Sequence, residues 1–209
     1  MERELVIVGW VTVVLVALSG TILGEDVVDP EVGDPFPLPF CIMSEEMLDE
    51  ESEISVDRGR ETRFCCEDCM SKFEQEAYIR VGEIDKALTE QQLPYYPLEK
   101  GIVSGDPLGE GAVDHIFRNR LFRLSSEAQI AVLEAAPAQY FAELDQAVTE
   151  KQASNYPLET CVVSGDPLGD GALENVVANQ LVRLAGFEQL VAFDENPGKY
   201  LAELREASE

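Results

Sequence analysis

Four of the five cysteines lie in one short part of the sequence. Cys41 is followed after 23 residues by the cluster Cys65, Cys66 and Cys69, whereas Cys161 stands alone. Thiolates are soft ligands that select Zn(II) or Cu(I) over Mg(II) or Ca(II). A loop cysteine followed by cysteines at a helix start suits such an ion, because a helix N-terminus lowers thiol pKa values. The four clustered cysteines are therefore candidate ligands for one Zn or Cu ion.

Two other readings of the cysteines stay open. In an oxidising compartment Cys41 could pair with Cys65, Cys66 or Cys69 as a structural disulfide, or the thiols could simply be buried and free. A thioredoxin-like dithiol at Cys66 and Cys69 is disfavoured because no βαβ pattern surrounds it. Cys161 has no partner in the sequence and is interpreted as a small buried apolar residue.

Nothing else in the chain suggests catalysis. His115 is the only histidine, which limits any histidine-dependent triad to this residue. The sequence Ser-Gly-Asp-Pro-Leu-Gly at 104–109 contains glycines but matches neither a dinucleotide fingerprint nor a P-loop. No pair of carboxylates stands out as an acid–base dyad. We therefore expect a protein that is not an enzyme.

The chain repeats itself with a period of sixty residues. Residues 156–169 (YPLETCVVSGDPLG) match residues 96–109 (YPLEKGIVSGDPLG) at eleven of fourteen positions, and residues 36–44 are a weaker copy in the same frame. Such a period indicates repeated structural units. The sequence predicts module 1 at 36–90 with the cysteine cluster, and modules 2 and 3 at 91–152 and 153–209, both without it.

Each module is expected to fold as a loop, a β-hairpin and a helix, in a treble-clef-like α+β arrangement. Short strand-like runs flank Gly59, Asn119 and Asn179, which align and suit a turn that needs positive φ. Apolar residues at helical spacing follow in every copy, and the aligned Pro137 and Pro197 predict a break in that helix.

The first residues predict a membrane anchor. Residues 5–24 contain no charged side chain and are long enough to span a bilayer as a helix. We assign 1–24 as a transmembrane helix, with a cleaved signal peptide as the alternative, and 25–35 as an acidic linker. Arg3 is the only basic residue before this span, which predicts a single-pass inner-membrane protein with its modules on the periplasmic side.

The charge of the chain restricts its partners. A formal net charge of −26 disfavours nucleic acid, which requires clustered Lys and Arg. The expected partners are the membrane, through the first helix, and a protein or a larger membrane complex.

The motif C-x23-C-x3-C, formed by Cys41, Cys65 and Cys69 before a helix that contains Phe73, resembles the TRASH and YHS group of small metal-binding domains. The phrase YPLETCVVSGDPLG is similar to YHS-like modules of secreted proteins from planctomycete-type bacteria. The resemblance covers 36–209 as three copies, and it implies heavy-metal or copper sensing, trafficking or resistance.

The positions aligned with Cys65, Cys66 and Cys69 are Ser125, Ser126 and Gln129 in module 2, and Ala185, Gly186 and Gln189 in module 3. Module 1 in turn has Glu45, Met47 and Asp49 in place of Gly105, Pro107 and Gly109, so its loop is expected to lose the turn.

These observations support two functions. The first is a membrane-anchored extracytoplasmic binding protein with one Zn or Cu site in module 1, at Cys41, Cys65 and Cys69 with Cys66 as fourth ligand. The second is a non-catalytic accessory subunit of a larger membrane complex, in which the cysteines form a disulfide staple.

Overall fold

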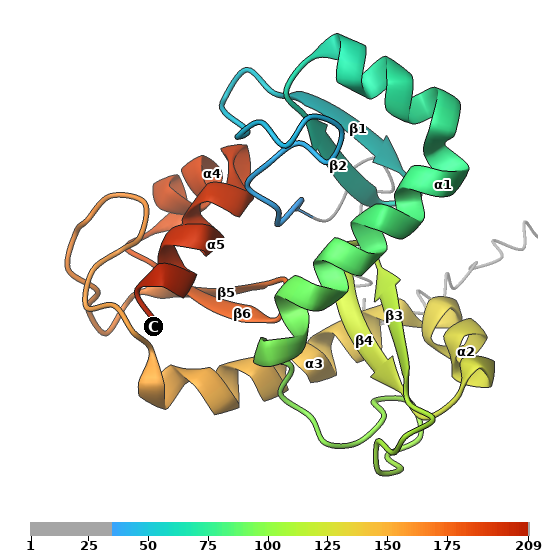
Figure 1. The fold of residues 1–209 in the computed structure, drawn as a ribbon. Coiled ribbons are helices and arrows are strands. Elements are labelled where there is room, and N and C mark those ends of the chain that lie inside the picture. The colour runs from blue at the N-terminus through green and yellow to red at the C-terminus, as the bar shows by residue number, and fades with distance from the viewer. Residues whose placement is uncertain (1–34, 209) are drawn as a thin grey trace, which may run out of the picture.

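Each module contains a loop and a two-stranded antiparallel hairpin (Figure 1). The structure, a computed structural model, describes residues 35–208. The hairpins pair β1 (Glu53–Asp57) with β2 (Arg60–Phe64), β3 (Val113–Phe117) with β4 (Arg120–Leu124), and β5 (Leu173–Val177) with β6 (Gln180–Leu184). Both residues of every turn have positive φ, with Gly59, Asn119 or Asn179 in second place. A two-residue hairpin turn of this kind requires that conformation, so the predicted hairpins are confirmed.

Helices follow every hairpin. Module 1 has the continuous helix α1 (Glu67–Gln92), whereas module 2 has α2 (Ile130–Ala135) and α3 (Pro137–Gln152), and module 3 has α4 (Phe187–Glu195) and α5 (Pro197–Glu206). Short 3₁₀ turns occupy Leu93–Tyr95, Glu127–Gln129 and Ala153–Asn155. Proline has no N–H to donate, so it begins α3 and α5 and ends the helix before it. Module 1 has Ala77 at the aligned position, and α1 continues without a break.

The fold class expected from the sequence was wrong in one respect, because it included an N-terminal transmembrane helix. The structure is α+β with small hairpin sheets and five α-helices, and none of the helices within 35–208 is long and apolar enough to cross a membrane. These helices are amphipathic: α1 buries a narrow stripe that includes Phe73, Ile84 and Leu88, and most of its charged residues are exposed. The segment 1–24, and all of the linker 25–35 except Pro35, lie outside the described residues.

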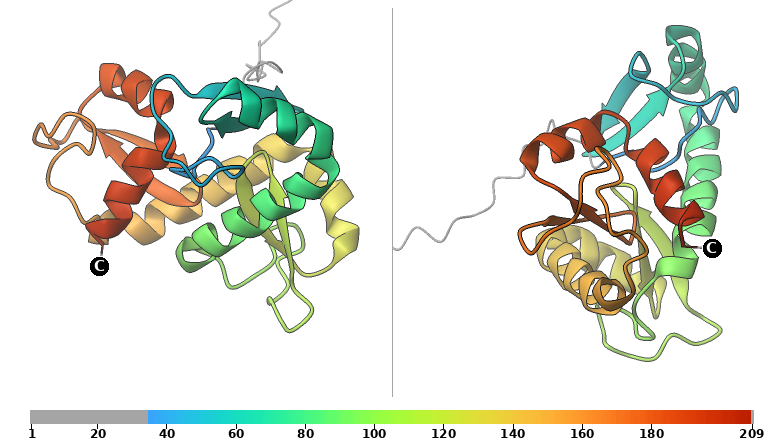
Figure 2. Two further views of the ribbon diagram at one scale, coloured as in Figure 1. Left: turned by 45° about the horizontal axis from the view of Figure 1, so that its top comes forward. Right: turned by 90° about the vertical axis from the view of Figure 1, so that its left-hand side faces the viewer.

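The helices connect one module to the next. In Figures 1 and 2, α1 leaves the β1–β2 hairpin and crosses β3–β4, and α3 continues from there to β5–β6. At the end of α1 the buried Gln92 donates its Nε2–H to the Asn119 carbonyl and accepts the Leu121 N–H on Oε1, both at 2.8 Å. Gln152 makes the same pair of bonds to the third hairpin, at 2.9 and 2.8 Å. The modules therefore form one continuous body.

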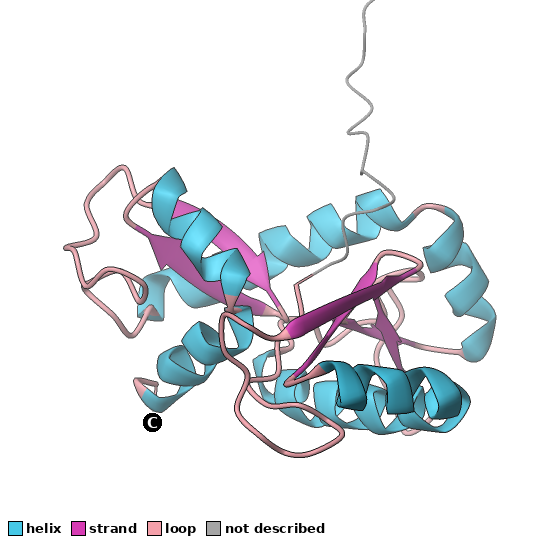
Figure 3. Ribbon diagram, turned by 90° about the horizontal axis from the view of Figure 1, so that it is seen from above, coloured by secondary structure: helices cyan, strands magenta, loops and turns pink. Residues whose placement is uncertain are grey.

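Three hydrophobic clusters fill this body, one beside each hairpin. The three hairpins remain separate sheets, drawn in magenta in Figure 3, and helices flank them. The first cluster contains Phe36, Phe64, Phe73 and Ile84, and Ile116 of the second hairpin packs against both the first and the second cluster. The cores are thus in contact across module boundaries, which adds buried area that a unit of sixty residues lacks alone.

Module 3 also contacts module 1. The buried Arg63 of β2 donates to the carbonyl oxygens of Asp194 and Glu195 at the C-terminus of α4, where a positive charge is favourable. Arginines aligned with Arg63 in the other hairpins instead pair with acidic residues on their own β-strand partners, at 2.8 and 3.4 Å. Gly198 of α5 packs against the loop of module 1 that precedes β1. A Cβ atom on Gly198 would be 2.1 Å from the Leu38 carbonyl oxygen, which is too close for any residue other than glycine.

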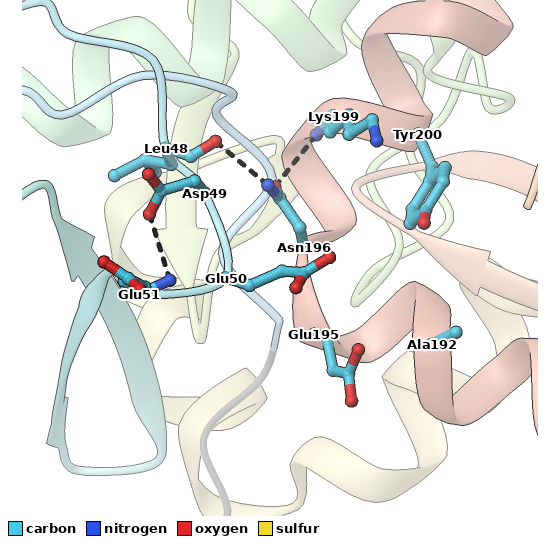
Figure 4. Close-up of a pocket in the computed structure, with 9 residues that line it drawn as sticks. All are labelled: Leu48, Asp49, Glu50, Glu51, Ala192, Glu195, Asn196, Lys199 and Tyr200. Carbon is cyan, nitrogen blue, oxygen red and sulfur yellow. Dashed lines mark hydrogen bonds between the residues drawn. The ribbon is translucent and has the colours of Figure 1, made fainter.

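Asn196 also holds modules 1 and 3 together, and it caps the N-terminus of α5 (Figure 4). Its Nδ2–H donates to the Leu48 carbonyl at 3.0 Å, and its Oδ1 accepts the Lys199 N–H at 3.3 Å. Module 2 has Ala136 at the aligned position, with nearly the same backbone (φ −144° and ψ 57°, against −151° and 71°). The backbone at Asn196 therefore accepts alanine, and the asparagine side chain serves the contact between modules 1 and 3.

We expect Asn196→Ala to lower the free energy of unfolding by about 2 kcal/mol, because a helix cap and a buried hydrogen bond are both lost. Denaturant unfolding followed by circular dichroism measures this change. Glu188→Ala, at an exposed position of α4, is the matched control and should change stability by less than about 0.5 kcal/mol. Equal stability of the two variants would contradict the contact.

Candidate metal centre

Cys41 lies on a tight loop that precedes β1. Its N–H donates to the Glu46 carbonyl and its own carbonyl accepts the Glu45 N–H, both at 2.8 Å. Modules 2 and 3 make the same two bonds at Gly101 and Cys161. Glu45 has φ of 62°, close to the 73° and 75° of the aligned glycines in those modules. The expectation that module 1 loses this turn was wrong, because Glu45 adopts the left-handed conformation that glycine provides elsewhere.

The other three cysteines lie where the hairpin meets the helix. Cys65 directly follows β2, Cys66 is the N-cap residue of α1, and Cys69 is in the first turn of that helix. The antiparallel pairing of β1 and β2 brings this corner next to the loop that carries Cys41. A long helix begins here, so its N-terminal dipole favours negative charge on these sulfurs.

The structure brings three of the four predicted ligands together. The Sγ atoms of Cys41, Cys65 and Cys69 all lie within 4.8 Å of one another, and the Cys65–Cys69 distance is 3.6 Å. Cys66 is exposed and outside this group, although its Sγ is 3.8 Å from that of Cys65. Sequence reasoning missed Ser44, whose Oγ lies 3.1 Å from the Cys65 sulfur. Three close cysteines can hold one metal ion.

The thiols do not ionise equally. Burial raises the pKa of Cys69 and opposes ionisation of Cys41, but backbone N–H groups, first that of Cys65, outweigh burial and lower the pKa of Cys41. The Cys69 N–H likewise lowers the pKa of Cys66. The Ser44 hydroxyl favours the Cys65 thiolate, but burial and hydrogen bonds with Glu46 and the neighbouring thiols together raise the Cys65 pKa. Neighbouring thiols compete for charge, and a cation between them would stabilise all three as thiolates.

Modules 2 and 3 close the same corner without a cysteine cluster. In module 2 Gln129 accepts the Ser125 N–H at 3.0 Å and donates to the Ser125 hydroxyl at 2.7 Å, and Ser104 Oγ lies 3.1 Å from that hydroxyl. In module 3 burial opposes ionisation of the Cys161 thiol, but backbone N–H groups, including that of Ala185, outweigh it and lower the pKa. Side-chain hydrogen bonds in module 2 thus replace the sulfur cluster of module 1.

All five cysteines are free in the structure. Cys41, Cys69 and Cys161 are buried, and Cys65 is partly exposed. His115, on β3, lies 3.1 Å from Glu134 and belongs to a different module from the cysteine cluster.

A scan of known protein families and searches of curated proteins and of solved structures found no match to this chain.

Proposed function

We propose that this protein binds one soft metal ion, Zn(II) or Cu(I), through the thiolates of Cys41, Cys65 and Cys69. The observation that carries this proposal is the convergence of the three Sγ atoms within 4.8 Å of one another. Cys66 is the nearest further sulfur and would supply a fourth ligand after a rotation of its side chain. The resemblance to TRASH and YHS domains agrees with this proposal and stays a prediction.

The distances support a metal better than a disulfide. Two sulfurs bound to one tetrahedral zinc at about 2.3 Å are about 3.8 Å apart, whereas a disulfide requires about 2.05 Å. The Cys65–Cys69 and Cys65–Cys66 separations are 3.6 and 3.8 Å. The hydroxyl of Ser44 would donate to the bound Cys65 thiolate, as outer groups do around many metal sites.

The exposure of the site supports exchange of the ion. Cys41 is fully buried, whereas Cys65 is partly exposed and Cys66 exposed. An ion at this corner would have a buried side, formed by Cys41 and Cys69, and a side that solvent or a donor protein can reach. We infer a role in taking up and releasing metal, with no catalytic step.

Titration of the reduced, metal-free protein tests the proposal. We expect about one equivalent of Zn(II) or Cu(I) to bind in competition with a chromogenic chelator, and bound metal to protect the cluster from a thiol reagent. Counting free thiols on a second sample, denatured without prior reduction, separates this function from a structural role. No bound metal together with fewer than five free thiols would overturn the proposal in favour of a disulfide-stapled scaffold.

A further inference from the structure

A cavity of about 510 Å³ lies between the β1–β2 hairpin, α1 and the turn of the second hairpin. Its apolar wall includes Phe73, Val81, Ile116 and Phe117. Three arginines, Arg58, Arg60 and Arg118, also line it, although the whole chain has only 15 basic residues against 41 acidic ones. This volume falls within the range typical of small-molecule sites.

The repeat explains why this cavity is open. In module 2 the equivalent space is filled by Phe141, whose ring packs at 5.0 Å from that of Phe122 and 6.3 Å from that of Phe117. The Arg120 guanidinium lies 5.4 Å from the centre of the Phe141 ring. In module 1 the three aligned aromatic positions hold Asp57, Thr62 and Val81, which are smaller or polar. Arg60, the equivalent of Arg120, therefore has no ring against it.

The cavity is lined by three arginines and four carboxylates, so its affinity for an anion depends on an arginine that no carboxylate pairs with. Arg60 is paired with Asp85 at 2.6 Å, Arg58 lies 3.8 Å from Asp57, and Glu134 bonds His115. Among the described residues Arg118 has no ion pair, and its Nε is buried without an acceptor. The Nη2 of Arg60 is likewise buried without an acceptor. Glu74 also lines the cavity but is exposed to solvent.

Arg118 is held in place by its surroundings. Its guanidinium lies 5.6 Å from the centre of the Phe117 ring and against Gly59, where a Cβ would be 2.7 Å from Nε. A guanidinium fixed beside an apolar wall loses little side-chain entropy when it binds an acid group.

We propose that this cavity binds a small aromatic carboxylate. Its ring takes the place against Arg60 that Phe141 takes against Arg120, and its carboxylate pairs with Arg118. This site is separate from the cysteine cluster and does not depend on metal binding.

Calorimetric titration of the protein with naphthalene-2-carboxylate tests the proposal, with the uncharged naphthalene-2-carboxamide as the matched control ligand. We expect saturable binding of the carboxylate, and binding of the amide at least about tenfold weaker. Saturation absent up to roughly 5 mM carboxylate, or equal affinities for the two ligands, would overturn it.

Two variants taken from the repeat locate the site. Val81→Phe introduces the residue of position 141 and should abolish binding, because the new ring fills the cavity. Arg118→Ala introduces the residue of position 178 and should weaken binding about tenfold or more. Both residues already occur in this repeat, and thermal unfolding confirms that each variant is folded. Unchanged affinity in either folded variant would refute the proposed placement.

Discussion

Replacing Cys69 by serine should weaken metal binding so far that a competing chelator removes the ion. A serine hydroxyl stays protonated near neutral pH and is a hard ligand, so the site would keep only two of its three converging thiolates. Apparent binding free energies of thiolate zinc sites are about 10–16 kcal/mol, so one ligand accounts for about 3 kcal/mol or more. We expect the affinity for Zn(II) or Cu(I) to fall by more than about a hundredfold in chelator competition.

The third module supplies the control for this substitution. Cys161 occupies the same loop position as Cys41, forms the same backbone bonds and is equally buried, but has no neighbouring cysteines. Cys161→Ser should therefore leave the metal stoichiometry and affinity unchanged, whereas Cys41→Ser should behave like Cys69→Ser. Retention of the ion by Cys69→Ser, or its loss from Cys161→Ser, would show that the metal is bound elsewhere.

Cys66→Ser distinguishes a three-sulfur from a four-sulfur site. If the exposed Cys66 rotates to complete a tetrahedron, its loss should weaken Zn(II) nearly as much as the loss of Cys69. If a water molecule or a partner supplies the fourth ligand, this variant should bind with an affinity within about tenfold of the unmodified protein.

The local elements of this fold could be predicted from the sequence because the repeat displays each of them more than once. Gly59, Asn119 and Asn179 identify the hairpin turns, since these residues accept positive φ. Pro137 and Pro197 identify helix starts, since proline cannot donate the N–H that a continuous helix requires.

The way in which the modules join could not be predicted. A repeat has the same local pattern whether a helix folds back on its own hairpin or crosses to the next one. The predicted boundary lies between residues 90 and 91, yet α1 continues to Gln92, whose buried amide bonds to the second hairpin. Long-range partners of this kind depend on tertiary packing, which no local signal contains.

The cysteines of the candidate site could be selected from the sequence, but their geometry could not be predicted. Spacing alone grouped Cys66 with the other three cysteines. In the structure, only the sulfur atoms of Cys41, Cys65 and Cys69 lie close together. Cys66 is the N-cap of α1, where the backbone is extended and its side chain is exposed. The left-handed conformation of Glu45 was also unpredictable, because the backbone bonds of the loop impose it against the preference of glutamate.

Replacing Gln92 by leucine should destabilise the whole protein by about 3 kcal/mol. The amide of Gln92 is completely buried and bonds one carbonyl and one N–H of the second hairpin. Leucine would remove both hydrogen bonds and leave the Leu121 N–H without its acceptor, and a buried group of this kind costs about 1–3 kcal/mol. The free energy of unfolding from denaturant titration measures the loss.

Comparison with other glutamines shows whether the cost comes from the joint between modules. Gln152→Leu removes the equivalent pair of bonds in the next joint and should cost a similar amount. Gln75→Leu, at an exposed position of α1 itself, should change stability by less than about 0.5 kcal/mol. If the three modules folded independently, Gln92→Leu would lower the free energy of unfolding as little as Gln75→Leu does. If they share one body, both joint variants should shift a single unfolding transition, because breaking either joint destabilises the elements on both sides of it.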